Sequence, residues 1–283
     1  MEGYTYKYPH PAITTDCVVF GFDGQQLKVL LIERGGEPCK GMWAFPGGFM
    51  HIDESAEECA LRELREETGL EITYIKQLGA FSAVNRDPRE RVVTIAFYSL
   101  ARQSEVRGGD DAASARWWAI GDVPQLAFDH DYILRQAMNR LRQDMHFEPV
   151  GFGLLDERFT IAELQRLYES ILGIHFDRRN FYKKMLQTGI LREVGGEGAE
   201  EHYYGRRREM KMMDIDSLFE PQSHSALPTT QMCCAAPAQD DDGEVGACDD
   251  AKPQRVGRKG RLFSFVKERY DQMKEDGKFR LEF

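Results

Sequence analysis

The stretch that decides the architecture of this chain runs from Gly47 to Leu70 and reads GGFMHIDESAEECALRELREETGL. Good helix formers fill it from about Ser55 to Thr68, with no proline or glycine among them. Gly69 stands where the C-cap of a helix is expected. The spacing therefore predicts a helix that follows closely on a Gly-Gly turn.

Three glutamates of this predicted helix share one face. Glu63, Glu66 and Glu67 are three and four residues apart, so their carboxylates lie close together. Like charges at this spacing repel, and a compensating cation is expected; clustered carboxylate oxygens suit Mg2+ or Mn2+. The alternative is a solvated charged face, but that interpretation leaves the Gly-Gly turn and the apolar residues between the acids without an explanation.

The stretch matches the fixed positions of the Nudix box, the signature of hydrolases that cleave nucleoside diphosphates linked to another group. The first part of the chain therefore resembles the Nudix family. The resemblance implies an α/β/α sandwich with a mixed sheet. The matching positions are Gly48, Glu54, Arg62, Glu63, Leu64, Glu66, Glu67, Gly69 and Leu70.

The resemblance also implies roles for these residues. Glu66 and Glu67 would be the main ligands of Mg2+ or Mn2+, with Glu63 assisting, and such an ion acts as a Lewis acid and makes a bound water nucleophilic. Glu54 would pair with Arg62 and brace the loop and the helix. The backbone at Gly47 and Gly48 can approach metal and phosphate closely because no side chain obstructs it.

Alternating strands and helices around the box indicate an α/β (α+β) fold. Strands are predicted at Pro11–Phe22 and Leu27–Glu33, joined by a hairpin at Asp23-Gly24, and again at Ile72–Phe81 and Val92–Leu100. An amphipathic helix is predicted over Asp129–Met145. We expect this first domain to span residues 1–147, because Pro and Gly interrupt the periodic pattern after Phe147.

A loop between two predicted strands carries two arginines. Residues 85–90 read NRDPRE, and a plain turn with solvated arginines is one interpretation. Together with Arg116-Trp-Trp118 and Leu126–His130, however, the loop resembles Nudix proteins that handle ADP-ribose. The resemblance implies that Arg86 and Arg89 hold diphosphate oxygens, a task that suits a planar guanidinium.

A second domain is predicted over residues 148–283. A capping box at Thr160 opens a helix to about Leu172. A second helix runs from Asp177, its expected cap, to about Thr188, and such a pair is typical of a helix-turn-helix. This part resembles the C-terminal winged helix of the Nudix-related transcriptional regulators. The residues that carry the resemblance are Phe159-Thr160, Glu163–Gln165, Leu167–Glu169, Arg179–Phe181 and Lys184–Leu186.

The wing of this domain is interrupted. We expect Ile190–Val194 to be its first strand and Gly260–Phe265 its second, followed by a helix over Lys267–Asp276; the alternative places the second strand at Tyr203–Met213. The residues between, about 195–256, combine a Pro/Ser/Thr/Ala-rich stretch with acidic runs. Such a segment cannot bury enough apolar surface to order itself, so a disordered insertion is predicted.

The second helix of the helix-turn-helix is basic, and Phe181, Met185 and Leu186 are expected to form its core side. A solvated face, or an element of a dimer or scaffold, is the alternative for four lysines and arginines on a short helix. The resemblance favours double-stranded DNA, with phosphate contacts from the cations and base readout near the start of the helix. A homodimer is expected, because paired half-sites match a two-fold protein. The predicted DNA-binding residues are Arg178, Arg179, Asn180, Lys183, Lys184, Arg258 and Lys259.

Composition sets further bounds. With 283 residues the chain is long enough for two hydrophobic cores. It has no long apolar run, so neither a membrane span nor a signal peptide is expected. A formal net charge of −10 argues against a protein that coats nucleic acid over its whole surface. No cysteine pair has zinc-ligand spacing, and the pattern fits reduced thiols in the cytoplasm. The cysteines are Cys17, Cys39, Cys59, Cys233, Cys234 and Cys248.

Two functional hypotheses follow. In the first, the chain is a metal-dependent Nudix hydrolase that cleaves the pyrophosphate of ADP-ribose or a related nucleoside diphosphate derivative and also binds DNA. In the second, it is a transcriptional regulator whose Nudix domain only senses ADP-ribose or a sugar effector. Many of the regulators that it resembles have degraded boxes, whereas this box is intact. We therefore expect catalytic competence, with DNA binding as a second activity.

Overall fold

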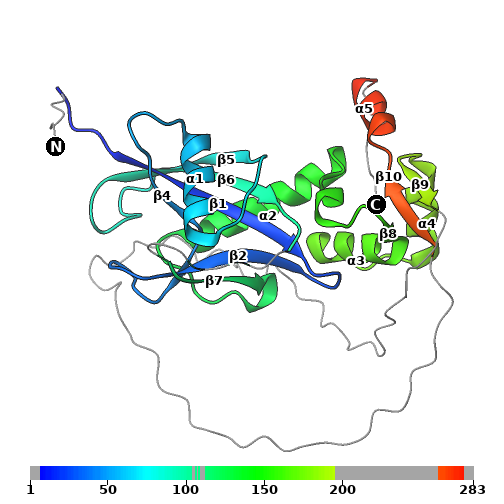
Figure 1. Ribbon diagram of the computed structural model, residues 1–283, viewed down its shortest axis with the longest axis horizontal. Helices are drawn as coiled ribbons and strands as arrows, with labels where there is room; N and C mark the ends of the chain where they lie inside the picture. The colour runs from blue at the N-terminus through cyan, green and yellow to red at the C-terminus, as the bar shows by residue number, and fades with distance from the viewer. Residues whose placement is uncertain (1–6, 104–105, 107, 109–111, 195–260, 277–283) are drawn as a thin grey trace, which may run out of the picture.

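A computed structural model of the protein describes residues 7–103, 106, 108, 112–194 and 261–276 (Figure 1). It shows a larger N-terminal domain built on a seven-stranded sheet and a smaller winged-helix domain with a three-stranded sheet. Helices α1 (Ala56–Thr68) and α2 (His130–Phe147) cover opposite faces of the larger sheet. None of the described helices is both long and apolar enough to cross a membrane.

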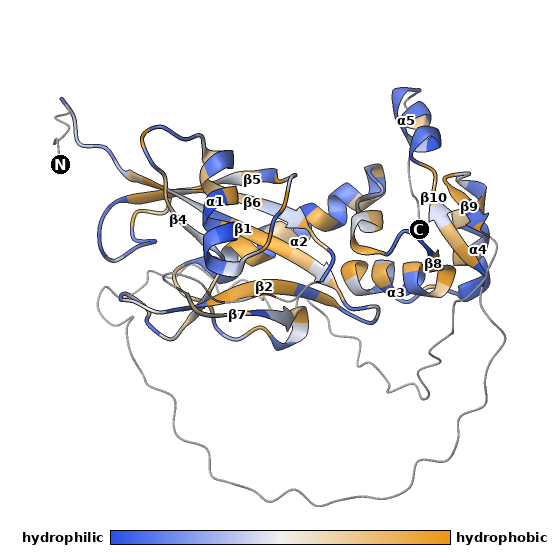
Figure 2. Ribbon diagram, in the orientation of Figure 1, coloured by the Kyte–Doolittle hydropathy of each residue, from blue (hydrophilic) through white to orange (hydrophobic). Residues whose placement is uncertain are grey.

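The central strand of the larger sheet is β1 (Ala12–Phe22), which is buried on both faces. It runs parallel to β6 (Val92–Leu100) and antiparallel to β2 (Leu27–Arg34), so the predicted mixed sheet is confirmed. Alternate residues point to opposite sides, as the pleat requires. Cys17 and Val19 pack towards α1, whereas Val18 and Phe20 pack towards α2. Figure 2 shows the resulting apolar stretch along β1 and β2.

Four strands of the larger sheet differ from the prediction. The predicted strand Ile72–Phe81 is shortened to β5 (Lys76–Phe81). Strands β3 (Trp43–Ala44), β4 (Gly47–Phe49) and β7 (Ala112–Ala119) were not predicted. The first two are too short to show a period in the sequence, and β4 exists because Gly47–Phe49 pairs with residues Thr14–Asp16 of β1. The expected Gly-Gly turn is therefore part of the sheet.

The predicted helix of the box is confirmed, including both of its ends. The Ser55 hydroxyl accepts a hydrogen bond from the Glu58 backbone, and the Glu58 carboxylate accepts one from the Ser55 backbone, which forms a capping box. Gly69 ends the helix with a φ of 70°. A residue with a Cβ is strained in this left-handed region, so glycine is favoured there.

The winged-helix domain follows a 3-10 turn at Val150–Leu154. Its helices are α3 (Ile161–Leu172), α4 (Arg178–Gln187) and α5 (Lys267–Glu275), with the predicted caps at Thr160 and Asp177. Its sheet has the order β8-β10-β9, in which β10 (Leu262–Phe265) pairs with β8 (Phe159–Thr160) and with β9 (Leu191–Val194). The later placement of the second wing strand is thereby confirmed.

Some of the predictions lie outside the described residues. These are the disordered insertion at about 195–256, the alternative wing strand Tyr203–Met213, the two predicted DNA contacts Arg258 and Lys259, and Cys233, Cys234 and Cys248. The three cysteines that the structure describes, Cys17, Cys39 and Cys59, are free thiols.

The two domains share one apolar core. Residues of α2, α3 and α4 belong to the same buried cluster, which also takes in Val18 and Phe20 of β1. Phe152, between the domains, stacks on Phe265 of the wing with ring centroids 4.5 Å apart. On α3, the Arg166 Nε donates to the Gly24 carbonyl of the β1–β2 hairpin at 2.8 Å. The predicted boundary at residue 147 coincides with the end of α2, but the packing continues across it.

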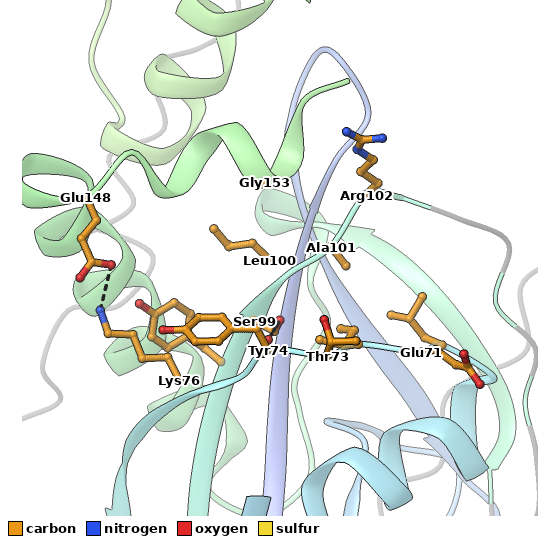
Figure 3. Close-up of a pocket in the computed structure, with 13 residues that line it drawn as sticks. Glu71, Thr73, Tyr74, Lys76, Ser99, Leu100, Ala101, Arg102, Glu148 and Gly153 are labelled. Carbon is orange, nitrogen blue, oxygen red and sulfur yellow. Dashed lines mark hydrogen bonds and ion pairs between the residues drawn. The ribbon is translucent and has the colours of Figure 1, made fainter. Parts of the chain in front are cut away.

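Asp144, near the end of α2, ties this helix to the sheet. Its carboxylate accepts hydrogen bonds from Lys76 Nζ at 2.7 Å, from Arg140 Nε at 3.0 Å and from the Tyr98 hydroxyl. Burial opposes ionisation, but the hydrogen bonds from Lys76 and Tyr98 outweigh it and hold the pKa of Asp144 below its usual value of 3.8. The same lysine pairs with Glu148 at 3.3 Å (Figure 3).

We expect Asp144→Asn to lower the free energy of unfolding by about 1.5–3 kcal/mol at pH 7, the range for hydrogen bonds to a charged group. A carboxylate with a lowered pKa stabilises the fold above its unfolded pKa of 3.8 and stops doing so as pH falls through its folded pKa. The difference from the parent chain should therefore shrink below pH 3.8. Urea unfolding at several pH values measures this.

The exposed Asp156 provides a matched control, since Asp156→Asn makes the same chemical change without a buried partner. It should alter the free energy of unfolding by less than about 0.5 kcal/mol. Equal effects of the two substitutions at pH 7 would contradict the proposed role of Asp144.

Candidate functional site

Arg62, on α1, lies at the centre of the box. Its guanidinium binds Glu54 through two contacts, Nε to Oε2 at 2.9 Å and Nη2 to Oε1 at 2.6 Å. The predicted pair between Glu54 and Arg62 is thus present. Glu54 Oε1 also accepts the backbone N–H of His51 at 2.7 Å, and the hydrogen bonds from Arg62 lower the pKa of Glu54 to about 2. This two-point contact fixes the loop before α1 against the helix.

The same arginine holds two of the three helix glutamates. Arg62 Nη1 donates to Glu63 Oε1 at 2.8 Å and to Glu66 Oε2 at 3.1 Å. In this structure Arg62 supplies the positive charge that the acidic face requires. Among the described residues, no group of three His, Cys, Asp or Glu side chains converges as a metal site. The Glu66 side chain is 44% exposed, so it is the box carboxylate with most freedom to turn away from Arg62.

Glu67 is in a different environment, because its carboxylate is buried. It accepts the Gly47 backbone N–H at 2.9 Å, through Oε2. Burial, followed by repulsion from Glu63 and Asp16, raises the pKa of Glu67 to about 8. Removal from water disfavours the charged form of a carboxylate, and a nearby cation would restore it. An added positive charge would therefore favour the ionised form of Glu67.

Gly47 and Gly48 permit the close contact between β4 and α1. A Cβ on Gly48 would lie 2.3 Å from Glu63 Oε1, and a Cβ on Gly47 would lie 2.1 Å from the Thr15 carbonyl oxygen. Real Cβ atoms do not approach other atoms so closely. Only glycine therefore fits at position 47, where the clash is with backbone, whereas a Cβ at position 48 would displace the Glu63 carboxylate. The glycines thereby bring a backbone segment against the carboxylates of the helix.

Arg86 lies beneath this surface and not on it. Its side chain is 4% exposed, and Nη2 lies 2.8 Å from Asp129 Oδ1 and 3.6 Å from Asp16 Oδ2. The predicted contact of Arg86 with diphosphate oxygens stays a prediction. In the structure its guanidinium neutralises two acids, Asp16 of β1 and Asp129 at the start of α2.

His130 completes this buried cluster. Its Nδ1 accepts the Phe45 backbone N–H at 3.0 Å, so the remaining ring proton is on Nε2, which lies 3.5 Å from Asp16 Oδ1. Burial lowers the pKa of His130, which favours the neutral ring. The sequence pattern predicted no role for Asp16, Asp129 or His130. The only signal was that the last two belong to the stretch Leu126–His130, quoted for its resemblance to proteins that handle ADP-ribose.

Arg89 is accessible, with a side chain that is 40% exposed. It pairs with Asp87 at 2.7 Å, and its guanidinium lies over the rings of Phe49 and Phe128, 5.2 Å and 5.9 Å from their centroids. Arg34 lies over the same Phe128 ring at 4.9 Å. Two arginines and two aromatic rings therefore line the rim beside the box.

Two tryptophans form a second aromatic group. Trp43, just before the Gly-Gly segment, meets Trp118 of β7 edge to face with centroids 5.1 Å apart, and Arg116 lies 4.3 Å above Trp118. The indole Nε1 of Trp118 is buried and has no hydrogen-bond partner among the described residues. The motif Arg116–Trp118 thus lies on a strand, with its first and third side chains on one face.

The second helix of the helix-turn-helix presents its polar residues to solvent. Phe181 and Met185 are buried, as predicted, whereas Leu186 is 37% exposed, so its predicted place in the core is wrong. Leu186 follows Met185 by one position, which turns it away from α3. Tyr182 is partly buried and packs against Phe263 of β10. The exposed residues are Arg178, Arg179, Asn180, Lys183 and Lys184.

A pocket of about 540 Å3 opens on another side of the sheet, where β5 and β6 meet the segment that leads into the winged helix. Lys76 and Glu148 lie at one end, and Glu71 and Arg102 lie at the other (Figure 3). None of the box carboxylates lines it. The pocket is therefore separate from the candidate site.

Comparison with known proteins adds independent findings. The NUDIX domain model matches residues 10–137, and the model of the NrtR DNA-binding winged helix domain matches residues 151–208. The chain is 34% identical over 195 residues to the ADPR responsive transcriptional repressor NtrR of Acinetobacter baylyi, covering 66% of this chain and 77% of the relative. It is 40% identical over 131 residues to the ADP-ribose pyrophosphatase of Methanocaldococcus jannaschii, covering 46% and 75%.

A solved structure spans both domains. The crystal structure of Shewanella oneidensis NrtR complexed with a 27mer DNA superposes with a TM-score of 0.56 at 33% identity, covering 69% of this chain and 90% of that chain. The matched family models, the relatives that span both domains and the geometry of the box all indicate a Nudix domain followed by a winged helix. The chain belongs to the Nudix family and joins an ADP-ribose pyrophosphatase-like Nudix domain to a DNA-binding winged helix of the NrtR type.

Proposed function

We propose that this protein is a DNA-binding Nudix hydrolase that cleaves the pyrophosphate of ADP-ribose or a related nucleoside diphosphate derivative with Mg2+ or Mn2+. The observation that supports this most is the box itself. Glu54, Arg62, Glu63, Glu66 and Glu67 are all present, and the first four form one hydrogen-bonded cluster beside the buried fifth. A domain that only senses a ligand has no need of this complete set.

The residues of the box fit a divalent cation chemically. Glu66, Glu67 and Glu63 offer hard oxygen donors, and Gly47 and Gly48 leave room that a Cβ would fill. When bound, the ion supplies Lewis acidity and a nucleophilic water. Arg62 then holds Glu54 and orients Glu63, while the backbone at the two glycines faces the phosphates.

The rim beside the box fits the rest of such a substrate. Arg89 and Arg34 are cations held over the ring of Phe128, and guanidinium groups bind phosphate oxygens in a fixed fork geometry. Phe49 and Phe128 offer faces to a nucleobase. The relatives from Acinetobacter baylyi and Methanocaldococcus jannaschii, named for ADPR and ADP-ribose, make ADP-ribose the first ligand to test. Arg86, which is enclosed, is proposed to act there by positioning Asp16 and Asp129.

The winged helix is proposed to bind double-stranded DNA. The exposed face of α4 offers Lys183, Lys184 and Arg178 to phosphates, and Arg179 and Asn180 near its start to base edges. The superposition on NrtR complexed with a 27mer DNA supports this assignment. We further propose a homodimer, which would present two such helices to paired half-sites, and a division of the chain into residues 1–147 and 148–283.

A second candidate is a regulator that binds ADP-ribose without cleaving it. The relative that spans both domains is named a repressor, which favours this alternative. In the structure, Arg62 occupies Glu63 and Glu66 and no set of three described acids converges. The two candidates differ only in turnover, since in both cases binding at one site is coupled to the other.

The first prediction separates the two candidates. Glu66→Gln removes a proposed metal ligand but keeps the size of the side chain, so hydrolysis of ADP-ribose with Mg2+ should fall by at least about 100-fold. The variant should also lose the rise in melting temperature that Mg2+ gives the parent chain. Phosphate release after phosphatase treatment and a thermal melt with and without Mg2+ measure the two quantities.

Glu57→Gln provides the matched control, because Glu57 is exposed on the first turn of the same helix and has no place in the site. It should keep both the turnover and the response to Mg2+. A Glu66→Gln chain that hydrolyses at the parental rate would remove Glu66 from the metal site. A parent chain that binds ADP-ribose without hydrolysing it would leave the sensing regulator as the function.

A second prediction concerns the close approach at Gly48. Gly48→Ala would place a methyl group within 2.3–2.7 Å of the Glu63 carboxylate and displace it. We expect turnover to fall by about tenfold or more, with a weaker response of the melting temperature to Mg2+. Gly79→Ala is the control, since a Cβ at Gly79 would have nothing within 4 Å and its φ is not in the left-handed region. Parental turnover in Gly48→Ala would contradict the fit.

A third prediction concerns DNA. Replacing Lys183 and Lys184 together with Ala should weaken binding to duplex DNA by about tenfold at about 100 mM salt and reduce the slope of log K against log salt by up to about 2. Fluorescence anisotropy with a labelled duplex at several salt concentrations measures both. Lys40→Ala with Arg65→Ala removes the same charge from exposed positions of the Nudix domain and should change neither. An unchanged slope in the α4 variant would exclude these lysines from the phosphate contacts.

A further inference from the structure

The negative charge of the chain is concentrated in one stretch. Residues 212–251 contain nine aspartates and glutamates and no lysine or arginine, whereas the formal net charge of the whole chain is −10. The remainder is therefore close to electrically neutral. The nine acids are Asp214, Asp216, Glu220, Asp240, Asp241, Asp242, Glu244, Asp249 and Asp250.

The exposed face of α4 carries positive charge that the described part of the chain does not neutralise. Arg178, Arg179 and Lys183 are exposed, and no described acid forms an ion pair with any of them. Two other arginines of this domain do have partners: the Arg166 Nε donates to a backbone carbonyl, and Arg261 lies 3.6 Å from Glu193. The three cations of α4 share one short helix, where DNA is proposed to bind.

The acidic stretch is attached beside this face. It belongs to residues 195–260, which the structure does not describe and which join β9 to β10. These two strands are paired, with Val194 opposite Leu262, and β10 packs against α4 through Phe263 and Tyr182. Both attachment points of the stretch therefore lie within the small winged-helix domain that contains α4.

Chain length is sufficient for contact. Asp250 precedes Leu262 by twelve positions, which can span up to about 40 Å when extended. Helix α4 has ten residues and is about 15 Å long. A tether of this length gives an effective concentration on the order of millimolar, so even a weak attraction between opposite charges produces substantial occupancy.

We propose that, when DNA is absent, the basic face of α4 binds the acidic segment 212–251 of the same chain. DNA must then displace carboxylates to reach α4. The competition with DNA rests on the proposed DNA-binding function. The contact between α4 and segment 212–251 does not depend on that function. The attraction raises the selectivity for specific over non-specific DNA. A non-specific duplex has only its phosphates to compete with the tethered acids, whereas a specific site also makes contacts through its bases.

Charge neutralisation of the acidic run tests the consequence. In the full chain, Asp240→Asn, Asp241→Asn and Asp242→Asn together should strengthen binding to non-specific duplex DNA by about fivefold at about 50 mM salt and steepen the slope of log K against log salt. The control Glu57→Gln, Glu71→Gln and Asp122→Asn removes equal charge from exposed positions of the Nudix domain. It should change affinity by less than about twofold. Equal gains in the two variants would overturn the proposal, because net charge alone would then explain them.

Cross-linking tests the contact without reference to DNA. A carbodiimide forms an amide between a lysine amine and a carboxylate in direct contact, and peptide mapping should find Lys183 joined to acids of 240–250. Lys183→Arg keeps the charge and should lose this cross-link. Excess duplex DNA should suppress it in the parent chain.

Cross-linking a mixture of heavy-isotope and light chains shows whether the acidic segment bound to α4 belongs to the same chain or to a second copy. Cross-links within one chain support the proposal, whereas mixed cross-links would overturn it in favour of a second copy. Absence of any cross-link between Lys183 and the acidic segment would also overturn it. A chain that binds no DNA but gives the intramolecular cross-link would refute the proposed DNA-binding function and leave the contact established.

Discussion

The site depends on the close contact between a glycine-containing strand and an acidic helix. Strand β4 pairs closely with β1 because Gly47 has no side chain, and the Glu63 carboxylate of α1 lies against Gly48 for the same reason. This places the Gly47 backbone N–H against the buried carboxylate of Glu67. Arg62 then holds the exposed side of the arrangement by binding Glu54, Glu63 and Glu66. A Cβ at position 47 would clash with the Thr15 carbonyl of β1, and a Cβ at position 48 would displace the Glu63 carboxylate.

Helix α2 connects this site to the winged helix. Its first residue, His130, lies in the buried cluster below the box, and Asp144 near its other end is bound by Lys76, Tyr98 and Arg140. The helix then leads into a core shared with α3 and α4. Because both ends are fixed by charged or hydrogen-bonded contacts, a displacement at the site would be transmitted along a rigid element. This is a physical route by which ligand binding and DNA binding can be coupled.

Hydrolysis and regulation make different demands on the same residues. In the proposed hydrolase, Glu66 would turn from Arg62 to hold a cation together with Glu67. In the proposed sensor, the rim of Arg89, Arg34 and Phe128 would be enough to bind the ligand. The burial of Glu67, which raises its pKa to about 8, makes the metal-free site unfavourable for a fully charged set of acids. An added cation would favour the charged form of Glu67.

The sequence by itself determined the local structure and the family. The helix formers and the stop at Gly69 that predicted α1, the amphipathic pattern of α2 and the caps of α3 and α4 are all short-range signals. Each of these helices begins and ends within a few residues of its prediction. The pairing of Glu54 with Arg62 followed from the family pattern. Only the tertiary structure decided that Gly47–Phe49 is a strand, that Arg86 is enclosed by Asp16 and Asp129, and that Leu186 is exposed. These features depend on residues far apart in the chain, whose proximity comes from sheet pairing and core packing and leaves no periodic signal in the sequence.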